Sequence, residues 1–175
     1  ISCNQACINE LFQQHDVSCL LNPACGRERD FAVLPASTRK KVMVIGGGPA
    51  GLEAARVAAL RGHDVTLVEE DDRLGGNFYV ASIPHTKEIL DAALGWMIRH
   101  TYSAGVKVEL GTKATADYVR QRKPDVLVIA TGSVPARPNV PGVEGSEVVL
   151  AQDVLLGRAT VGTRVLVVGG GLVGV

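Results

Sequence analysis

Apolar and polar positions follow two different rhythms along the chain from Lys41 onward. Short runs rich in valine, isoleucine and leucine predict buried strands, and longer stretches with apolar residues three and four positions apart predict helices. Strands and helices that alternate in this way indicate parallel pairing through right-handed crossovers, so the predicted fold class is α/β. The predicted strands are KVMVIGG, DVTLVE, VKVEL, DVLVIATG and TRVLVVGGG, and the predicted helices are PAGLEAARVAALRG, residues 87–103 and TADYVRQR.

Three parts of the chain differ in character. Residues 1–36 carry all four cysteines, and the stretch LPASTRKK then has the composition of a linker. We predict one α/β domain over residues 37–157 and the beginning of another over residues 158–175. At 175 residues the chain is long enough for one domain with its own core.

Composition narrows the function classes. The chain is 46% hydrophobic and 21% charged, with a formal net charge of zero. This balance predicts neither nucleic acid nor a membrane as a partner, and no apolar run reaches the roughly 18 residues of a membrane span. No basic-then-apolar leader precedes Cys3, so a cytoplasmic location is expected, where thiols stay reduced. Four cysteines then favour metal binding or other chemistry over disulfides.

A first glycine motif, Gly46-x-Gly48-x-x-Gly51, joins the first predicted strand to its helix. Gly46 permits a tight turn, Gly48 lets the backbone approach a pyrophosphate, and Gly51 allows close packing of helix on strand. Pro49 and Ala50 begin the helix, whose free N–H groups attract phosphate.

Two further features lie at the end of the second predicted strand and after it. Glu69 lies 18 residues after Gly51 and can accept a hydrogen bond from a ribose hydroxyl, with Glu70 beside it. The pair Gly75-Gly76 then provides a second flexible turn. The alternative is that Glu69 simply belongs to the solvated acidic run EEDDR.

A third turn, Ala130-Thr131-Gly132, stands at the end of the stretch DVLVIATG and lets the backbone pass close to a cofactor. The order GxGxxG, Glu, GG, ATG resembles the flavoproteins with two dinucleotide-binding domains. This resemblance implies a Rossmann-like FAD-binding domain over residues 37–157. It also implies that Gly169-x-Gly171-x-x-Gly174 begins an inserted NAD(P)H-binding domain. Because the chain stops at Val175, we expect a fragment that binds NAD(P)H poorly.

The cysteines Cys3, Cys7 and Cys19 have the spacing C-x3-C-x11-C. This spacing fits neither a zinc ribbon nor a C-x-x-C redox pair, and an iron–sulfur cluster remains, although three thiolates are one short of the usual four. Buried apolar thiols are the alternative. Cys25 is interpreted as a structural or free thiol, with a role as a substitute fourth ligand left open.

The stretches CNQACINELF, SCLLNPACGRE and KKVMVIGGGPAGLEAARVAALRGHDVTLVE resemble the iron–sulfur flavoenzymes related to 2,4-dienoyl-CoA reductase and trimethylamine dehydrogenase. The resemblance covers essentially the whole chain. It implies that Cys3, Cys7 and Cys19 are ligands of a 4Fe–4S cluster and that residues 1–36 form the cluster segment. The first cysteine of the family's motif would stand immediately before Ile1.

The resemblance also implies a function. Electrons would pass from NAD(P)H through FAD and the cluster to FMN in a preceding barrel domain. That barrel would bind the small-molecule substrate and reduce an activated carbon–carbon double bond. No catalytic residue is expected in this chain, and the substrate, the choice between NAD and NADP and the oligomeric state stay open.

Three alternatives remain. An amine dehydrogenase of the same family holds ADP in the FAD site. An electron-delivery subunit like the small subunit of glutamate synthase carries two cysteine groups, whereas one is present here. The third alternative is a nucleotide-binding domain without redox activity.

Overall fold

The computed structural model describes residues 3–171, and its centre is a parallel sheet of four strands in the order β3-β2-β1-β4. Val44 in the first strand lies opposite Leu67 on one side and opposite Val128 on the other. The predicted α/β fold class is confirmed. The strands are β1 (Lys41–Ile45), β2 (Asp64–Val68), β3 (Lys107–Glu109) and β4 (Val126–Ile129).

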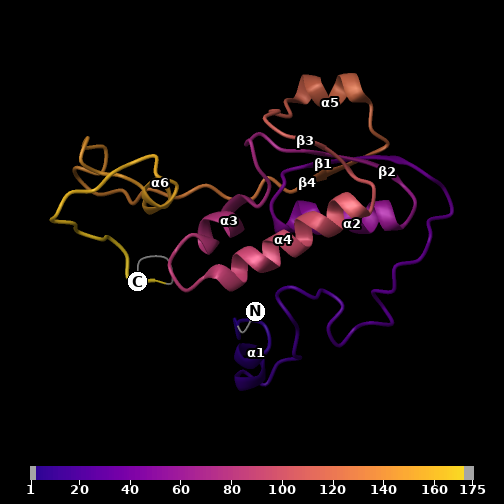
Figure 1. Cartoon of the computed structure of the whole chain (residues 1–175), viewed down its shortest axis with the longest axis horizontal. Helices are drawn as coiled ribbons and strands as arrows, with labels where there is room; N and C mark the ends of the chain where they lie inside the picture. Colours follow the sequence, from indigo (N-terminus) through magenta and orange to yellow (C-terminus); the bar gives the residue numbers. More distant parts are fainter. Residues whose placement is uncertain (1–2, 172–175) are drawn as a thin grey trace.

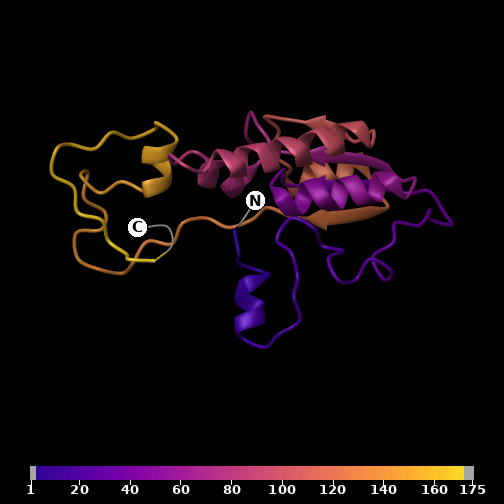
Figure 2. The ribbon, with the colours of Figure 1, turned by 60° about the horizontal axis from the view of Figure 1, so that its bottom comes forward.

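Two helices cover one face of this sheet. Figures 1 and 2 show α2 and α4 side by side over the strands, with α5 beside β3 and α3 at the end of α4. The longest helix, α4, has 16 residues, and no helix between residues 3 and 171 has the length and apolar character to span a membrane. The helices are α1 (Ile8–Phe12), α2 (Pro49–Leu60), α3 (Gly76–Ser82), α4 (Glu88–Ser103), α5 (Ala116–Arg122) and α6 (Ala151–Leu155).

The helix boundaries follow local chemistry. Pro49 occupies the first position of α2, where its missing N–H costs nothing, and Gly62 with φ +93° turns the chain back toward β2. At α5 the Thr115 side chain caps the helix by accepting a hydrogen bond from the Tyr118 N–H at 3.2 Å. The predicted α2, α4 and α5 are therefore confirmed within one or two residues.

The core lies between the sheet and the helices α2 and α4. Leu52 and Leu67 are completely buried within it, and so is the polar side chain of Thr101. The Thr101 hydroxyl donates to the carbonyl oxygens of Met97, at 2.9 Å, and Leu52, at 3.3 Å. The buried hydroxyl therefore has hydrogen-bond partners, and it joins α4 to α2.

The predicted strand TRVLVVGGG is wrong for the described residues. Residues 163–171 form no regular element, and Leu166 and Val168 are 86% and 77% exposed. A strand needs a neighbour to satisfy its backbone groups, and within residues 3–171 no strand lies beside this segment, which lies apart from the sheet in Figure 1. Three short helices, α1, α3 and α6, were not indicated by the sequence pattern. The domain boundaries at residues 36 and 157 stay predictions.

Glu109 fastens α5 to the edge of the sheet. Its carboxylate accepts hydrogen bonds from Arg122 Nη1 at 2.8 Å and Nη2 at 3.0 Å, and another from the Tyr118 hydroxyl. The Arg122 guanidinium also lies 4.7 Å from the centroid of the Tyr118 ring. The hydrogen bonds from Arg122 and then from Tyr118 lower the pKa of Glu109.

We expect Glu109→Gln to destabilise the chain at neutral pH and to remove part of its acid sensitivity. Because the folded-state pKa of Glu109 is lowered, its stabilisation is present above the ordinary glutamate pKa and disappears as the pH falls through the lowered value. Thermal unfolding of both proteins between pH 7 and pH 3 measures this difference. A difference in stability that stays constant over this range would contradict the assignment.

Candidate functional site

Three glycine turns meet at the carboxyl ends of the strands. The turn after β1, called the first turn below, the Gly75-Gly76 pair and the turn after β4 all lie at this edge, as expected for a parallel sheet. The Gly75 N–H donates to the Gly47 carbonyl at 2.9 Å, and the Ala130 N–H donates to the Ile45 carbonyl at 2.8 Å. The fold therefore brings together three motifs that lie far apart in the sequence.

Gly46 and Gly51 are required by the protein's own packing. Gly46 has φ +103°, and a Cβ there would lie 2.3 Å from the carbonyl oxygen of Ala130. A Cβ at Gly51 would lie 1.8 Å from the Gly46 carbonyl oxygen. No side chain fits at either position, because the first turn is pressed against β4 and against the start of α2.

Gly48 differs from its two neighbours in the motif. Its backbone is in an ordinary extended conformation, with φ −72° and ψ 179°, and a Cβ there would meet no protein atom within 4 Å. The space above Gly48 is open. It lies at the beginning of α2, where Pro49 and Ala50 belong to the first turn of the helix. The first N–H groups of a helix have no partner within the helix, so the open space over the Gly48 backbone fits a phosphate. We call this surface the open floor at Gly48.

Glu69 lies beneath the first turn rather than in a solvated acidic run. It is 8% exposed, and its two carboxylate oxygens accept from the N–H groups of Gly47, at 2.5 Å, and Asp71, at 2.9 Å. Each oxygen retains a lone pair for a ribose hydroxyl. Glu70 is exposed and 3.8 Å from Lys113 Nζ, which makes a weak surface pair.

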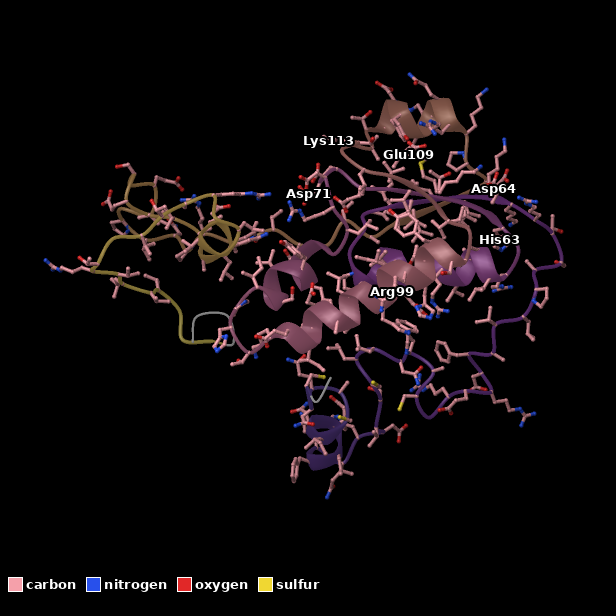
Figure 3. The ribbon with its side chains drawn as sticks, viewed as in Figure 1. His63, Asp64, Asp71, Arg99, Glu109 and Lys113 are labelled. Carbon is pink, nitrogen blue, oxygen red and sulfur yellow. The ribbon has the colours of Figure 1, made fainter. Side chains whose placement is uncertain are left out.

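Figure 3 shows which end of the sheet this site occupies. Asp71 and Lys113 follow β2 and β3 and lie at the carboxyl end of the strands, whereas His63 and Asp64, at the beginning of β2, lie at the opposite end. Asp64 and Asp71, at the beginning of β2 and beyond its end, therefore lie at opposite edges of the sheet.

The Gly75-Gly76 pair packs directly on the first turn. Gly75 has φ +124°, and a Cβ there would lie 2.6 Å from Leu94 Cδ2. At Gly76 a Cβ would lie 3.4 Å from the Gly48 Cα. The next residue, Asn77, donates to the Ser133 carbonyl at 3.2 Å, a contact that the sequence patterns do not reveal. Its place directly after a glycine pair is the one signal that could have drawn attention to it.

The remaining predicted residues of the nucleotide sites are less constrained. Thr131 and Gly132 are exposed beyond β4, and Gly132 has φ +71°. Gly169 and Gly171 lie in the irregular segment described above, where a Cβ would meet no atom within 4 Å. Gly174 lies outside the described residues. The second glycine motif therefore has no formed strand–turn–helix within residues 3–171.

The cysteine segment is folded into a closed loop. The Ala6 carbonyl accepts from both the N–H of Ser18, at 3.0 Å, and its hydroxyl, at 3.2 Å, which brings the chain next to Cys7 close to the chain next to Cys19. The N–H groups of Leu21 and Asn22 lower the pKa of the Cys19 thiol, as N–H donors do for a ligating thiolate.

The thiols themselves do not form a ligand set here. Within residues 3–171 no group of three or more His, Cys, Asp or Glu side chains is arranged to hold a metal ion, and all four cysteines are free thiols. The ligand set Cys3, Cys7 and Cys19 therefore stays a prediction from the family resemblance.

Two grooves of about 740 and 620 Å³ flank α2 on the side of the cysteine segment. Their walls include Phe31, Val57 and, in the second groove, Trp96. Neither groove is lined by a residue of the glycine turns or by Glu69, so both are separate from the predicted nucleotide site.

A family model described as pyridine nucleotide-disulphide oxidoreductase matches residues 40–175. The chain belongs to the pyridine nucleotide-disulphide oxidoreductase family. Membership of this family supports FAD and NAD(P)H as cofactors.

Several similar proteins are named as reductases. The chain is 41% identical over 174 residues to the cinnamate reductase of Clostridium sporogenes, a match that covers 99% of this chain and 26% of that protein. It is 42% identical over 179 residues to the metal reductase of Desulforamulus reducens, covering 100% and 27%. The solved complex of 2-naphthoyl-CoA reductase with 2-naphthoyl-CoA has TM-score 0.88 and 38% identity, covering 92% and 25%. The chain thus spans about a quarter of these relatives, and the resemblance to the 2,4-dienoyl-CoA reductase group is confirmed.

We expect Gly48→Ala to leave folding intact and to abolish FAD binding. The added methyl group meets no protein atom but fills the floor over which the pyrophosphate would pass, so affinity should fall at least about 100-fold. Flavin titration followed by fluorescence measures the affinity, and urea unfolding measures stability. Gly162→Ala, which also meets open space but lies outside the three turns, is the matched control.

Unchanged FAD affinity in Gly48→Ala would contradict this site. Gly46→Val is a less informative variant, because its side chain would collide with Ala130 and damage the fold itself.

For Glu69→Gln we expect weaker FAD binding together with a loss of about 2 kcal/mol in the free energy of unfolding. The new amide group would turn an N–H donor toward one of the two backbone N–H groups that the carboxylate now satisfies. Urea unfolding of the flavin-free protein tests the second effect. The control is Asp72→Asn, which changes an exposed carboxylate of the same acidic run. Equal stability of the two variants would argue against the buried role of Glu69.

Proposed function

We propose that this chain is the electron-input module of an NAD(P)H-dependent flavin oxidoreductase that reduces an activated carbon–carbon double bond. The observation that carries the proposal is the open floor at Gly48, bounded by Glu69 and by the two other glycine turns, in a chain of this family. The alternative without redox activity has less support, because the similar proteins are named as reductases.

The names of the relatives suggest a division of labour. They refer to cinnamate, to metal and to 2-naphthoyl-CoA, although each relative shares this quarter of its length with the chain. Because the named acceptor differs among relatives that share this module, we infer that another part of the protein binds the acceptor. We therefore assign the small-molecule substrate to a domain outside this chain, of the FMN-binding barrel type that the resemblance implies. Neither nucleic acid nor a membrane is a proposed partner.

The residues present fit FAD. The start of α2 with Gly48, Pro49 and Ala50 would hold the pyrophosphate, and the free lone pairs of Glu69 would accept from the ribose hydroxyl groups. The turn at residues 130–132 would run beside the more distal part of the cofactor. Bound FAD supplies the chemistry of taking a hydride from a nicotinamide and giving up electrons singly. The glycine motif from Gly169 would begin the NAD(P)H site.

A 4Fe–4S cluster is the second proposed cofactor, with Cys3, Cys7 and Cys19 as ligands. The closed loop from Ala6 to Ser18 and the N–H donors to Cys19 support this proposal, and so do relatives that match across the cysteine segment. Because the thiols are not gathered in the described residues, we derive no electron-transfer step through the cluster.

Cofactor analysis of the full-length parent protein, purified without oxygen, tests the function. We expect FAD and FMN to be released on denaturation, with about four irons and matching sulfide per chain. Cys19→Ser should lose most of the iron, whereas the matched variant Cys25→Ser should retain it.

The other outcomes are equally informative. ADP in place of FAD would move the protein to the amine-dehydrogenase branch of the family. Neither nucleotide together with no iron would overturn the proposed function. Full iron in Cys19→Ser would contradict the ligand assignment alone.

A further inference from the structure

One side-chain amide connects three parts of the chain at the edge of the nucleotide site. Asn77 follows the Gly75-Gly76 pair, and its Nδ2 donates to the Ser133 carbonyl at 3.2 Å and to the Ser133 hydroxyl at 3.3 Å. Gln152 Nε2, from α6, donates to Asn77 Oδ1 at 3.5 Å. The partners Asn77 and Ser133 are 56 residues apart in the chain.

The bond from Asn77 completes a ring of contacts. Gly46 is pressed against the carbonyl of Ala130 on one side of the first turn, and Gly76 packs on Gly48 on the other. Each of these contacts is made by backbone. The outer ends of the two flanking turns are joined by the Asn77 side chain, so the ring encloses the edge of the open floor at Gly48.

The turn that Asn77 holds has little other support. Within the described part of the chain, residues 131–137 take part in no backbone–backbone hydrogen bond, whereas Ala130 still donates to Ile45. Val134 in this stretch is 89% exposed. Without the amide, the segment beyond Ala130 would be free to swing away from the first turn, because few contacts restrain it.

We propose that Asn77 is a positioning residue for the cofactor. It acts through Ser133, because its hydrogen bonds keep the turn after β4 next to the space that FAD would occupy. The Asn77 side chain does not itself touch the cofactor. The inference rests on the proposed FAD site and assigns to this side chain the control of how tightly FAD is retained.

The test uses the full-length enzyme with and without its flavin. In Asn77→Ala we expect the dissociation constant of FAD to rise about tenfold, as for loss of one net hydrogen bond that orders the site. The same variant, freed of flavin, should be cleaved by thermolysin between Pro135 and Ala136 several times faster than the wild-type protein. Gln152→Ala removes the longer bond to Asn77 but keeps the bond to Ser133, so both quantities should stay within about twofold of wild type.

Each result decides a different point. Weaker FAD binding with unchanged cleavage of the flavin-free protein would overturn the inference, because Asn77 would then contact the cofactor directly. An unchanged dissociation constant in Asn77→Ala would also overturn it. A wild-type enzyme that contains no FAD would overturn the proposed function itself, whereas normal FAD in wild type confines a failure to Asn77.

Discussion

The proposed nucleotide site depends on a buried carboxylate. Glu69 directly follows β2, lies beneath the first glycine turn and accepts hydrogen bonds from the N–H groups of Gly47 and Asp71. A buried charge is costly unless hydrogen bonds compensate for it, and here two backbone donors do so. The same bonds hold the turn in the shape that leaves Gly48 facing open space. Stability of the turn and competence to bind a nucleotide therefore have one physical origin.

The three glycines of the first motif serve two different purposes. The packing of the folded chain requires glycine at positions 46 and 51, because a Cβ at either would overlap a carbonyl oxygen. Gly48 has no such neighbour, so its lack of a side chain is of use chiefly to a ligand. The GxGxxG sequence motif does not distinguish these three glycines from one another. The contacts separate them and show which substitution reports on binding and which reports on folding.

The cysteine segment and the nucleotide domain are physically joined. Leu21, two residues after Cys19, packs against the core between the sheet and the helices. The segment that would carry a cluster is thus anchored on the same core that positions the glycine turns.

The sequence by itself determined the fold class, the four strands of the sheet and the helices α2, α4 and α5, because each carries its own apolar period and its own start and stop residues. It also indicated Glu69 and the three glycine turns, since their residue types are dictated by local geometry. Tertiary structure alone decided that Asn77 meets Ser133, because no local rule relates residues 56 positions apart. It also decided that TRVLVVGGG forms no strand here: an apolar run becomes a strand when a neighbour satisfies its backbone, and within residues 3–171 none does.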